Sequence, residues 1–358
     1  MARIVNPINP STFIDLGDAF QERPSSFGRI KNSGLFEVEN IVDRTHLYKY
    51  EPFIQARMTG LTSVTERDKW KTTKGKGRAI GLSASAIALT DGVQYEDVAG
   101  RVRAWDDLTE ETITDLALDK LDVMGRSFDM STEYMFLTAA QGVMLNPEDD
   151  SDALDMYEVT GITRETDTWD LTQATGVLEK INEITNRLIE YNLRGGNITG
   201  IEIMVADDVF NALSSHPELI TFYEAAFYGT GLAYVNNPFI NRSANRVVRD
   251  VQGLSRSFTV ESVTFSTYPE KFQRWDGTAI TAIPSGKGFT IVRGLRDQYQ
   301  VKYTPAPYIS QLGNQGQEQY VWRTPIKNDT HFEVFLESYP IIFMKDPKLS
   351  IDITFTLA

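Results

Sequence analysis

The longest helical pattern in the chain covers residues 107–141. Apolar side chains recur there at steps of three, four and seven residues, which places them on one stripe of a helix. The stripe consists of Ile113, Ala117, Leu121, Met124, Phe128, Met135 and Ala139. Carboxylates such as Asp107 and Glu110 suit the start of a helix, and Gly142 suits the position after its end. A helix of this length would span roughly 50 Å, so the pattern predicts a long strut.

A second amphipathic pattern predicts a helix over residues 172–192. Its shared apolar face consists of Val177, Ile181, Ile184, Leu188 and Tyr191. The near-continuous apolar run at 201–206 predicts a buried strand. Asp207 and Asp208 are then expected to cap a short helix, and Pro217 is expected to open another.

From residue 246 onward the chain is rich in strand patterns. The segments are RVVRDV, SFTVESVTF, TAITAI, GFTIVRG, YQVKYTP, HFEVFL, IIFM and IDITFTL. In the last of them Ile351, Ile353, Phe355 and Leu357 alternate with polar residues, as in strands with one buried face. PSGKG at 284–288 is expected to be a hairpin turn between TAITAI and GFTIVRG. Helices followed by many strands predict an α+β fold.

Residues 1–45 show no sustained periodicity. Ser11 is a candidate N-cap for a short helix that would carry Ile14 and Leu16 and end before Pro24. The remainder is expected to be an extended arm, and a helical arm docked on its own subunit is an equally weighted alternative.

Residues 50–90 are predicted to form a long hairpin. One leg is FIQARMTGLTSVTE and the return leg is AIGLSASAIALT. The tip between them, residues 66–78, has a net charge of +4, which leaves −18 on the rest of a chain whose net charge is −14. The candidate binding residues at this tip are Arg67, Lys69, Trp70, Lys71, Lys74, Lys76 and Arg78.

A basic segment that contains a tryptophan could bind nucleic acid or an acidic protein surface. The acidic remainder of the chain repels phosphates and offers a complementary surface for the tip on an identical neighbour. We therefore favour self-association over nucleic-acid binding for the hairpin.

The amino-acid composition excludes several kinds of chemical site. The chain of 358 residues has no Cys, which excludes disulfides, thiolate metal sites and a cysteine nucleophile. Its three histidines, His46, His216 and His331, are far apart in the sequence and are expected to be structural. The longest apolar run, 341–344, is too short to cross a membrane, and the N-terminus has no signal-peptide pattern. These features predict a soluble protein made in the cytoplasm.

No motif predicts a cofactor, a metal site or an enzyme. GKGRAIG at 75–81 misses the spacing of a dinucleotide fingerprint by one residue, and PSGKG lacks the first Gly and the Ser/Thr of a phosphate loop. The acidic loop EDDSD at 148–152 lacks the ligand spacing of a calcium loop and is expected to be solvated.

The order of parts resembles the Hong Kong 97 fold of tailed-phage major capsid proteins. The residues that carry the resemblance are VRGLR at 292–296, YVWRTP at 320–325, ESYPIIFMKDP at 337–347 and the terminal IDITFTLA. These segments, with STFIDLGDAF and PSSFGRIKNSGLF near the start, are similar to the lambda-type (E protein) capsid family.

The resemblance implies a division of the chain into five parts. Residues 1–49 would be an N-terminal arm, and 50–90 an extended E-loop. Residues 91–150 would be the peripheral domain with its spine helix, and 151–310 mostly the axial domain. Residues 311–358 would be the return strands of both domains.

The resemblance also implies a function and partners. The chain would assemble as hexamers and pentamers into an icosahedral shell around double-stranded DNA, without sequence-specific binding of that DNA. A separate scaffold protein, a portal and a decoration protein would be partners, and the protein would belong to the virion after assembly in the host cytoplasm. An encapsulin-like compartment, a nucleic-acid-binding protein that uses residues 66–78 and a hydrolase with an unrecognised carboxylate pair are the alternatives.

Overall fold

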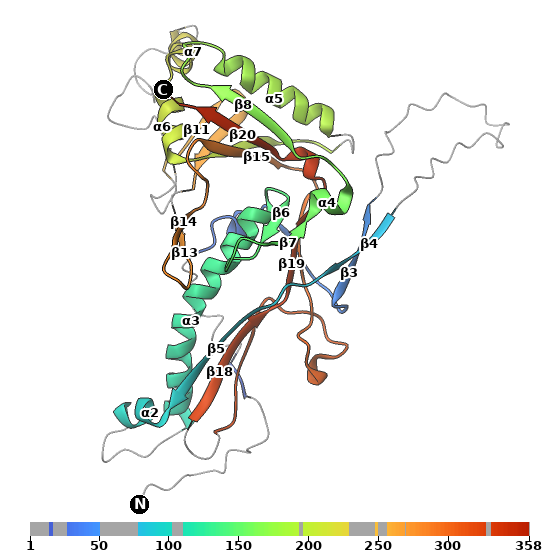
Figure 1. The fold of residues 1–358 in the computed structure, drawn as a ribbon, viewed down its shortest axis with the longest axis vertical. Coiled ribbons are helices and arrows are strands. Elements are labelled where there is room, and N and C mark those ends of the chain that lie inside the picture. Colours follow the sequence, from blue (N-terminus) through green and yellow to red (C-terminus); the bar gives the residue numbers. More distant parts are fainter. Residues whose placement is uncertain are drawn as a thin grey trace, which may run out of the picture. The chain divides into compact units, whose positions relative to one another are not determined.

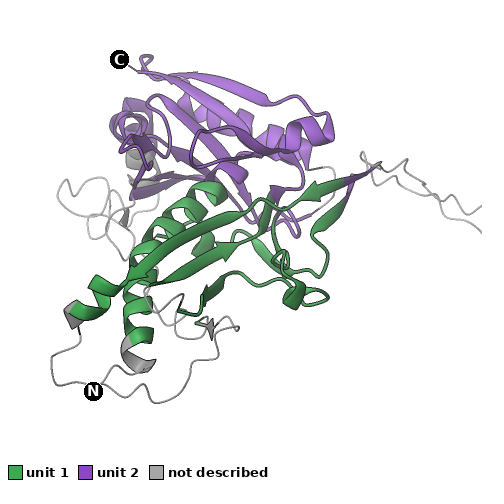
Figure 2. Ribbon diagram, turned by 60° about the horizontal axis from the view of Figure 1, so that its bottom comes forward, with its two compact units in different colours: residues 1–47, 81–136, 300–342 green, residues 48–80, 137–299, 343–358 purple. Residues whose placement is uncertain are grey.

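The computed structural model describes residues 14–16, 27–50, 78–101, 110–192, 196–228, 248–249, 256–268, 270–326 and 331–357. Figure 1 labels the elements, and Figure 2 colours the two compact units into which the chain divides. Unit 1 contains residues 1–47, 81–136 and 300–342, and unit 2 contains residues 48–80, 137–299 and 343–358. Each unit is therefore assembled from three separate stretches of sequence.

Unit 1 is built around one long helix and an antiparallel sheet. The helix α3 (Glu110–Ala139) has 30 residues, and its last three are counted in unit 2. The sheet has the order β1 (Ile14–Asp15), β17 (Tyr320–Arg323), β18 (His331–Ser338) and β5 (Ile87–Gln94). A short helix, α2 (Tyr95–Arg101), follows β5 directly. The long helix predicted over 107–141 is thus confirmed for Glu110–Ala139, whereas residues 140 and 141 form a turn and 107–109 lie outside the described residues.

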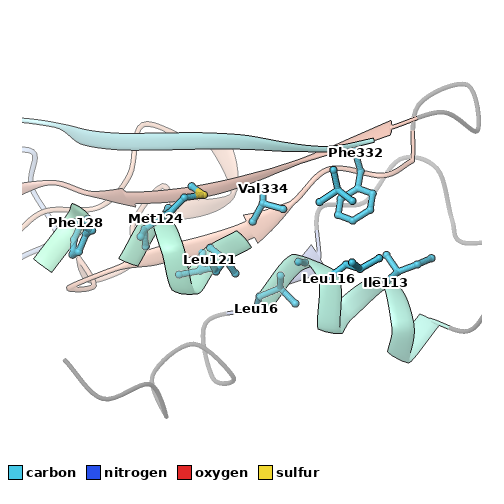
Figure 3. Close-up of a cluster of buried hydrophobic side chains, with 12 residues drawn as sticks. Leu16, Ile113, Leu116, Leu121, Met124, Phe128, Phe332 and Val334 are labelled. Carbon is cyan, nitrogen blue, oxygen red and sulfur yellow. The ribbon is translucent and has the colours of Figure 1, made fainter. Parts of the chain in front are cut away.

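The apolar stripe of α3 packs against this sheet (Figure 3). Every residue of the predicted stripe is at most 8% exposed. The opposing side chains come from alternate positions of β18, namely Phe332, Val334 and Leu336, together with Val93 of β5 and Val321 of β17. Leu16, which follows β1, joins the same cluster. The apolar side chains that recur with the helical period of α3 therefore pack in one core with the side chains that alternate along the strands.

A second, three-stranded sheet has the order β19 (Pro340–Met344), β16 (Tyr299–Tyr303) and β2 (Glu37–Asn40). All five residues of β19 are buried, whereas all four residues of β2 are exposed. The strands β2 and β16 run parallel, and Lys302 lies opposite Glu39 in their register. Both β19 and β2 are edge strands of this sheet, so the difference in burial reflects what covers each of them and not their place in the sheet order.

A buried carboxylate of α3 fixes the segment before β2. Glu133 is fully buried, and its two carboxylate oxygens accept hydrogen bonds from the backbone N–H groups of Ile30 (2.5 Å) and Lys31 (3.2 Å). These donors lie at the start of a 3₁₀ turn, η1 (Lys31–Ser33), where backbone N–H groups otherwise lack partners. The segment 27–36 is therefore docked on the helix of its own chain.

We expect Glu133→Ala to lower the free energy of unfolding by about 2–4 kcal/mol, since it leaves buried N–H groups without acceptors and opens a cavity. Glu133→Gln is the matched control, because its single carbonyl oxygen retains one of the two bonds and its loss should be clearly smaller. Urea unfolding followed by circular dichroism measures both. Equal losses for the two variants would show that the hydrogen bonds contribute little.

Unit 2 contains a seven-stranded mixed sheet. Its order is β10 (Val248–Arg249), β11 (Arg256–Val260), β12 (Val263–Thr267), β9 (Gly200–Val205), β15 (Lys287–Arg293), β20 (Ile351–Thr356) and β8 (Glu165–Asp170). The pairs β12–β9 and β20–β8 are parallel, and the other pairs are antiparallel. The buried residues Ile351, Ile353 and Phe355 confirm the predicted alternation, and Leu357 is half-buried.

Three helices accompany this sheet: α5 (Val177–Tyr191), α6 (Asp207–Ser215) and α7 (Pro217–Tyr228). In α5 the residues Val177, Ile181, Ile184 and Leu188 are buried, and the helix contacts β8 and α7. Further elements of unit 2 are the hairpin β6 (Val143–Leu145) and β7 (Asp152–Asp155), the helix α4 (Met156–Thr160), the hairpin β13 (Lys271–Gln273) and β14 (Ala279–Thr281), and the 3₁₀ turn η4 (Pro347–Leu349).

Gly142 lies three residues beyond the end of α3 and has a φ of 91°. A Cβ atom at this position would lie 2.7 Å from the ring of Tyr157. The predicted break after the helix is therefore confirmed, and it needs glycine for both its backbone angle and its packing.

Two local predictions near the N-terminus and the hairpin are wrong. Ile14–Asp15 is a strand that pairs with β17, because tertiary pairing overrides the short helical pattern after Ser11. The predicted return leg of the hairpin is two strands, β4 (Arg78–Ser83) and β5, separated by residues 84–86. Of these two, β4 pairs with β3 (Thr45–Tyr50), whereas β5 pairs along its whole length with β18. The predicted outgoing leg FIQARMTGLTSVTE, which follows β3, lies outside the described residues.

Three local predictions in unit 2 also need correction. PSGKG is no hairpin turn, since β14 pairs with β13 and β15 pairs with β9 and β20. The N-cap of α6 is Ala206, so Asp207 and Asp208 lie in its first turn, and Asp208 accepts a hydrogen bond from the backbone of Gly286 at 3.0 Å. The helix predicted from residue 172 starts at Val177, because residues 171–175 form a turn and a bend and Gly176 is the N-cap with a φ of 110°.

Candidate functional site

The predicted basic tip falls almost entirely outside the described residues. Arg67, Lys69, Trp70, Lys71, Lys74 and Lys76 lie in the stretch 51–77, which the structure does not describe. Arg78 is the first residue of β4. The structure therefore shows how the chain enters and leaves this segment, and the binding role of its residues stays a prediction.

The strand that leads into the segment is fastened at Tyr48. This side chain is 3% exposed, and its hydroxyl donates a hydrogen bond of 2.6 Å to the carbonyl of Lys345. Its ring also packs edge-on against Phe343, with 5.7 Å between the ring centroids. The chain therefore enters the stretch 51–77 shortly after a residue that is fixed within unit 2.

A charged group lies beside the start of β3. The ammonium of Lys302 is almost completely buried and pairs with the exposed carboxylate of Glu39 across the β16–β2 register. His46 is half-buried near this pair. Burial and the positive charge of Lys302 lower the pKa of His46, so its ring is mostly neutral at pH 7. A neutral ring avoids placing a second positive charge beside Lys302.

The remaining histidines are held in separate structural settings. His216 lies between α6 and α7 and is 3% exposed, and its Nε2 atom is 2.8 Å from the carbonyl oxygen of Gln173. His331 begins β18 in unit 1, whereas His216 belongs to unit 2. Among the described residues, no group of three or more His, Asp or Glu side chains is placed to hold a metal ion.

No helix in the described part of the chain is both long enough and apolar enough to span a membrane.

One surface feature was missed by the sequence analysis: the loop between β16 and β17. Glu337 of β18 is buried and accepts hydrogen bonds of 2.7 Å from the hydroxyls of Tyr308 and Tyr339. Burial and the Glu337 carboxylate raise the pKa of Tyr308 to about 12 and also raise the pKa of Tyr339, so both hydroxyls remain donors. The ring of Tyr308 packs edge-on against Trp322, with 4.1 Å between centroids.

The sequence marks residues 307–317 as a loop but does not mark its apolar residues as exposed. Ile309 and Leu312 lie in a segment that is otherwise rich in Pro, Gly, Asn and Gln, as loops are. Isolated apolar residues in such a segment have no periodicity, so their burial or exposure can be read only from the structure.

Comparison with solved structures identifies the fold. The crystal structure of a prophage capsid protein from E. coli CFT073 has 10% sequence identity to this chain and a TM-score of 0.57, covering 97% of this chain and 100% of its own. The mature capsid of bacteriophage PhiM1 has 10% identity and a TM-score of 0.50, covering 94% of this chain and 90% of its own. At such identities the likeness establishes a shared fold, the Hong Kong 97-like capsid fold.

The family is established by sequence. No curated protein sequence matches the chain significantly. A family model described as phage major capsid protein E, however, matches residues 12–355, which is nearly the whole chain. This match extends through both units and agrees with the fold. The chain belongs to the phage major capsid protein E family.

Proposed function

We propose that many copies of this chain assemble, as hexamers and pentamers, into the icosahedral head shell that encloses the double-stranded DNA of a tailed phage. The observation that carries the proposal is the family match over residues 12–355. The role is structural, and we propose no catalytic activity. The finished protein would reside in the virion after assembly in the host cytoplasm.

Each part of the chain would have its own role in the shell. Residues 1–49 would be the arm, 50–90 the E-loop that reaches a neighbouring subunit, and 91–150 the peripheral domain with α3 as its spine. Residues 151–310 would form most of the axial domain, and 311–358 the return strands. The fixed entry of the E-loop at Tyr48 and the continuous buried stripe of α3 support these roles.

Other proteins would take part in assembly. We propose a separate scaffold protein, a portal and a decoration protein as partners, and packaged DNA that is held without sequence-specific contacts. The net charge of −14 supports the last point, since an acidic shell binds DNA weakly and allows it to enter and leave.

Negative-stain electron microscopy of the purified protein, alone and co-expressed with the scaffold gene from the same phage, tests the proposal. We expect hollow shells or ring-shaped capsomers. Nuclease treatment and analysis of the contents of particles from infected cells should then yield protected double-stranded DNA. A protein cargo in place of DNA would indicate a compartment of the encapsulin type, and the absence of any assembly under both conditions would contradict the proposal.

The basic tip provides a prediction that separates self-association from nucleic-acid binding. Replacing Lys69, Lys71, Lys74 and Lys76 together by Glu should leave a folded subunit that needs roughly tenfold or more protein to assemble. Each exposed ion pair contributes only about 0–1 kcal/mol, so a single substitution should be tolerated. Four substitutions weaken every subunit contact, and this loss of binding free energy is repeated at each contact of a closed shell.

The control for this variant replaces the same four lysines by Arg, which keeps the charge. Sedimentation across a salt series, with and without DNA, measures assembly and binding. If the Glu variant assembles normally but loses affinity for DNA, the tip binds nucleic acid and our interpretation of it is wrong.

A further inference from the structure

The loop of residues 307–317 in unit 1 is fastened to the rest of the unit at both of its ends. Tyr308 fixes its beginning through Glu337 and Trp322, as described above. Its end is fixed by the N–H of Gly316, which donates to the carbonyl of Ile41 at 2.8 Å, and by the N–H of Gln317, which donates to the Tyr320 hydroxyl at 3.0 Å. Between these points the loop is braced by its own backbone hydrogen bonds, including Gln311 to Tyr308 and Asn314 to Gln311.

Gly316 also lets the loop close against the backbone of β16. A Cβ atom at this position would lie 2.1 Å from the carbonyl oxygen of Tyr303. The C-terminal end of the loop is therefore held by a contact that leaves no room for a side chain at position 316, and its N-terminal end is held by the side chain of Tyr308. Such a segment presents its outward side chains without a large ordering penalty on binding.

Two aliphatic side chains point away from this scaffold. Ile309 is 94% exposed and Leu312 is 86% exposed, and they are the most exposed large hydrophobic residues of the described part of the chain. Ile309 is the first residue of the 3₁₀ turn η3 (Ile309–Gln311), and Leu312 is its C-cap. Because residues three apart in a 3₁₀ turn are eclipsed, both side chains lie on the same side of the loop.

The chemistry around this apolar pair suits a second copy of the same loop. No charged residue occurs between Lys302 and Glu318. The polar residues of the loop are Ser310, Gln311, Asn314, Gln315 and Gln317, whose hydroxyl and amide groups both donate and accept hydrogen bonds. Copies of a chain with a net charge of −14 repel one another, and an uncharged, self-complementary surface allows their closest approach.

The small size of the surface also favours a copy over a foreign partner. One short loop with two aliphatic side chains is far below the roughly 1,000 Å² that a stable complex of free proteins buries. A partner held by this loop alone would dissociate, whereas a neighbour in a closed shell is already held by other contacts.

We propose that the 307–317 loop makes a homotypic contact: in the assembled shell, Ile309 and Leu312 of one copy pack against the same residues of a neighbouring copy. The inference rests on the proposed function, because it needs a shell. A symmetric contact of this kind uses the same patch on both partners.

Site-directed crosslinking tests the contact. The natural chain has no Cys, so Leu312→Cys introduces a single thiol. We expect mild oxidation or a short bifunctional maleimide to link copies into covalent dimers in assembled shells and not in unassembled subunits. Val123→Cys is the control, because Val123 is a 64% exposed aliphatic residue of the same unit that has no place in the proposed contact; it should stay monomeric in denaturing gels.

A second variant tests the energetic role. Ile309→Ser combined with Leu312→Ser should leave the melting temperature of the subunit unchanged, since both side chains are exposed, and should raise the protein concentration needed for assembly by roughly tenfold. Normal assembly of this variant would overturn the proposal.

The outcomes separate this inference from the proposed function. Shells that give no dimers with either Leu312→Cys or Ile309→Cys would overturn the homotypic contact and leave the shell function standing. If the cysteine variants did not assemble, hydrogen exchange of the loop amides in wild-type shells would decide, and exchange equal to that of free subunits would overturn the contact. A wild-type chain that forms no shells under any condition would contradict the proposed function itself.

Discussion

A chain that lacks residues 349–358 is expected to yield no soluble, folded protein. The deletion removes β20, which lies inside the seven-stranded sheet between β15 and β8. Among the strands that the structure describes, β8 pairs with β20 alone, so it would lose its place in the sheet as well. Ile351, Ile353 and Phe355 are at most 4% exposed, and burying each contributes about 1.5–3 kcal/mol. The sum is comparable with the whole stability of a typical domain.

The matched control for this truncation removes only residues 357–358, which follow β20. Leu357 is half-buried and lies outside the strand, so this shorter deletion should leave solubility and the circular dichroism spectrum nearly unchanged. Soluble yield and size-exclusion chromatography compare the two chains. Normal shells from the longer deletion would mean that β20 is dispensable.

The second large effect is expected for Met124→Pro. Met124 lies near the middle of α3 and belongs to the core that the helix forms with the four-stranded sheet (Figure 3). Proline removes the hydrogen bond from the N–H of residue 124 to the carbonyl of Lys120 and clashes with the preceding turn, at about 3 kcal/mol or more. The resulting kink would also separate Leu121 and Phe128 from their partners, so we expect insoluble protein.

The control at the same position is Met124→Leu, which conserves volume and should lower stability by less than about 1.5 kcal/mol. Thermal unfolding and the soluble fraction after expression measure both variants. Recovery of normal particles from the proline variant would show that a continuous helix is not required.

Several elements were predictable because a strong local pattern and its burial coincide. The stripe of α3 has a clear helical period, and every one of its seven residues is buried. The terminal strand alternates perfectly with a period of two, and it forms β20. In both cases one face of one element is apolar, so the local sequence leaves a single way to bury it.

The candidate sites were less predictable. The basic tip stands out by charge alone, and its residues lie outside the described structure apart from Arg78. The 307–317 loop has no period and no motif, and its importance comes from exposure at Ile309 and Leu312. Exposure is a property of the folded surface, so a sequence pattern does not report it directly.

By itself, the sequence determined the long helix, the terminal strand, the mixed α+β character, the absence of cysteine chemistry and, through scattered segments, the capsid family. Only the tertiary structure decided which strands pair. It placed β5 with β18 instead of with the hairpin, made Ile14–Asp15 a strand, and inserted β20 between β15 and β8. The physical reason is that strand pairing joins residues far apart in the chain. A strand's own residues specify which face is buried, but its neighbours are chosen by the shape of the whole sheet and its core.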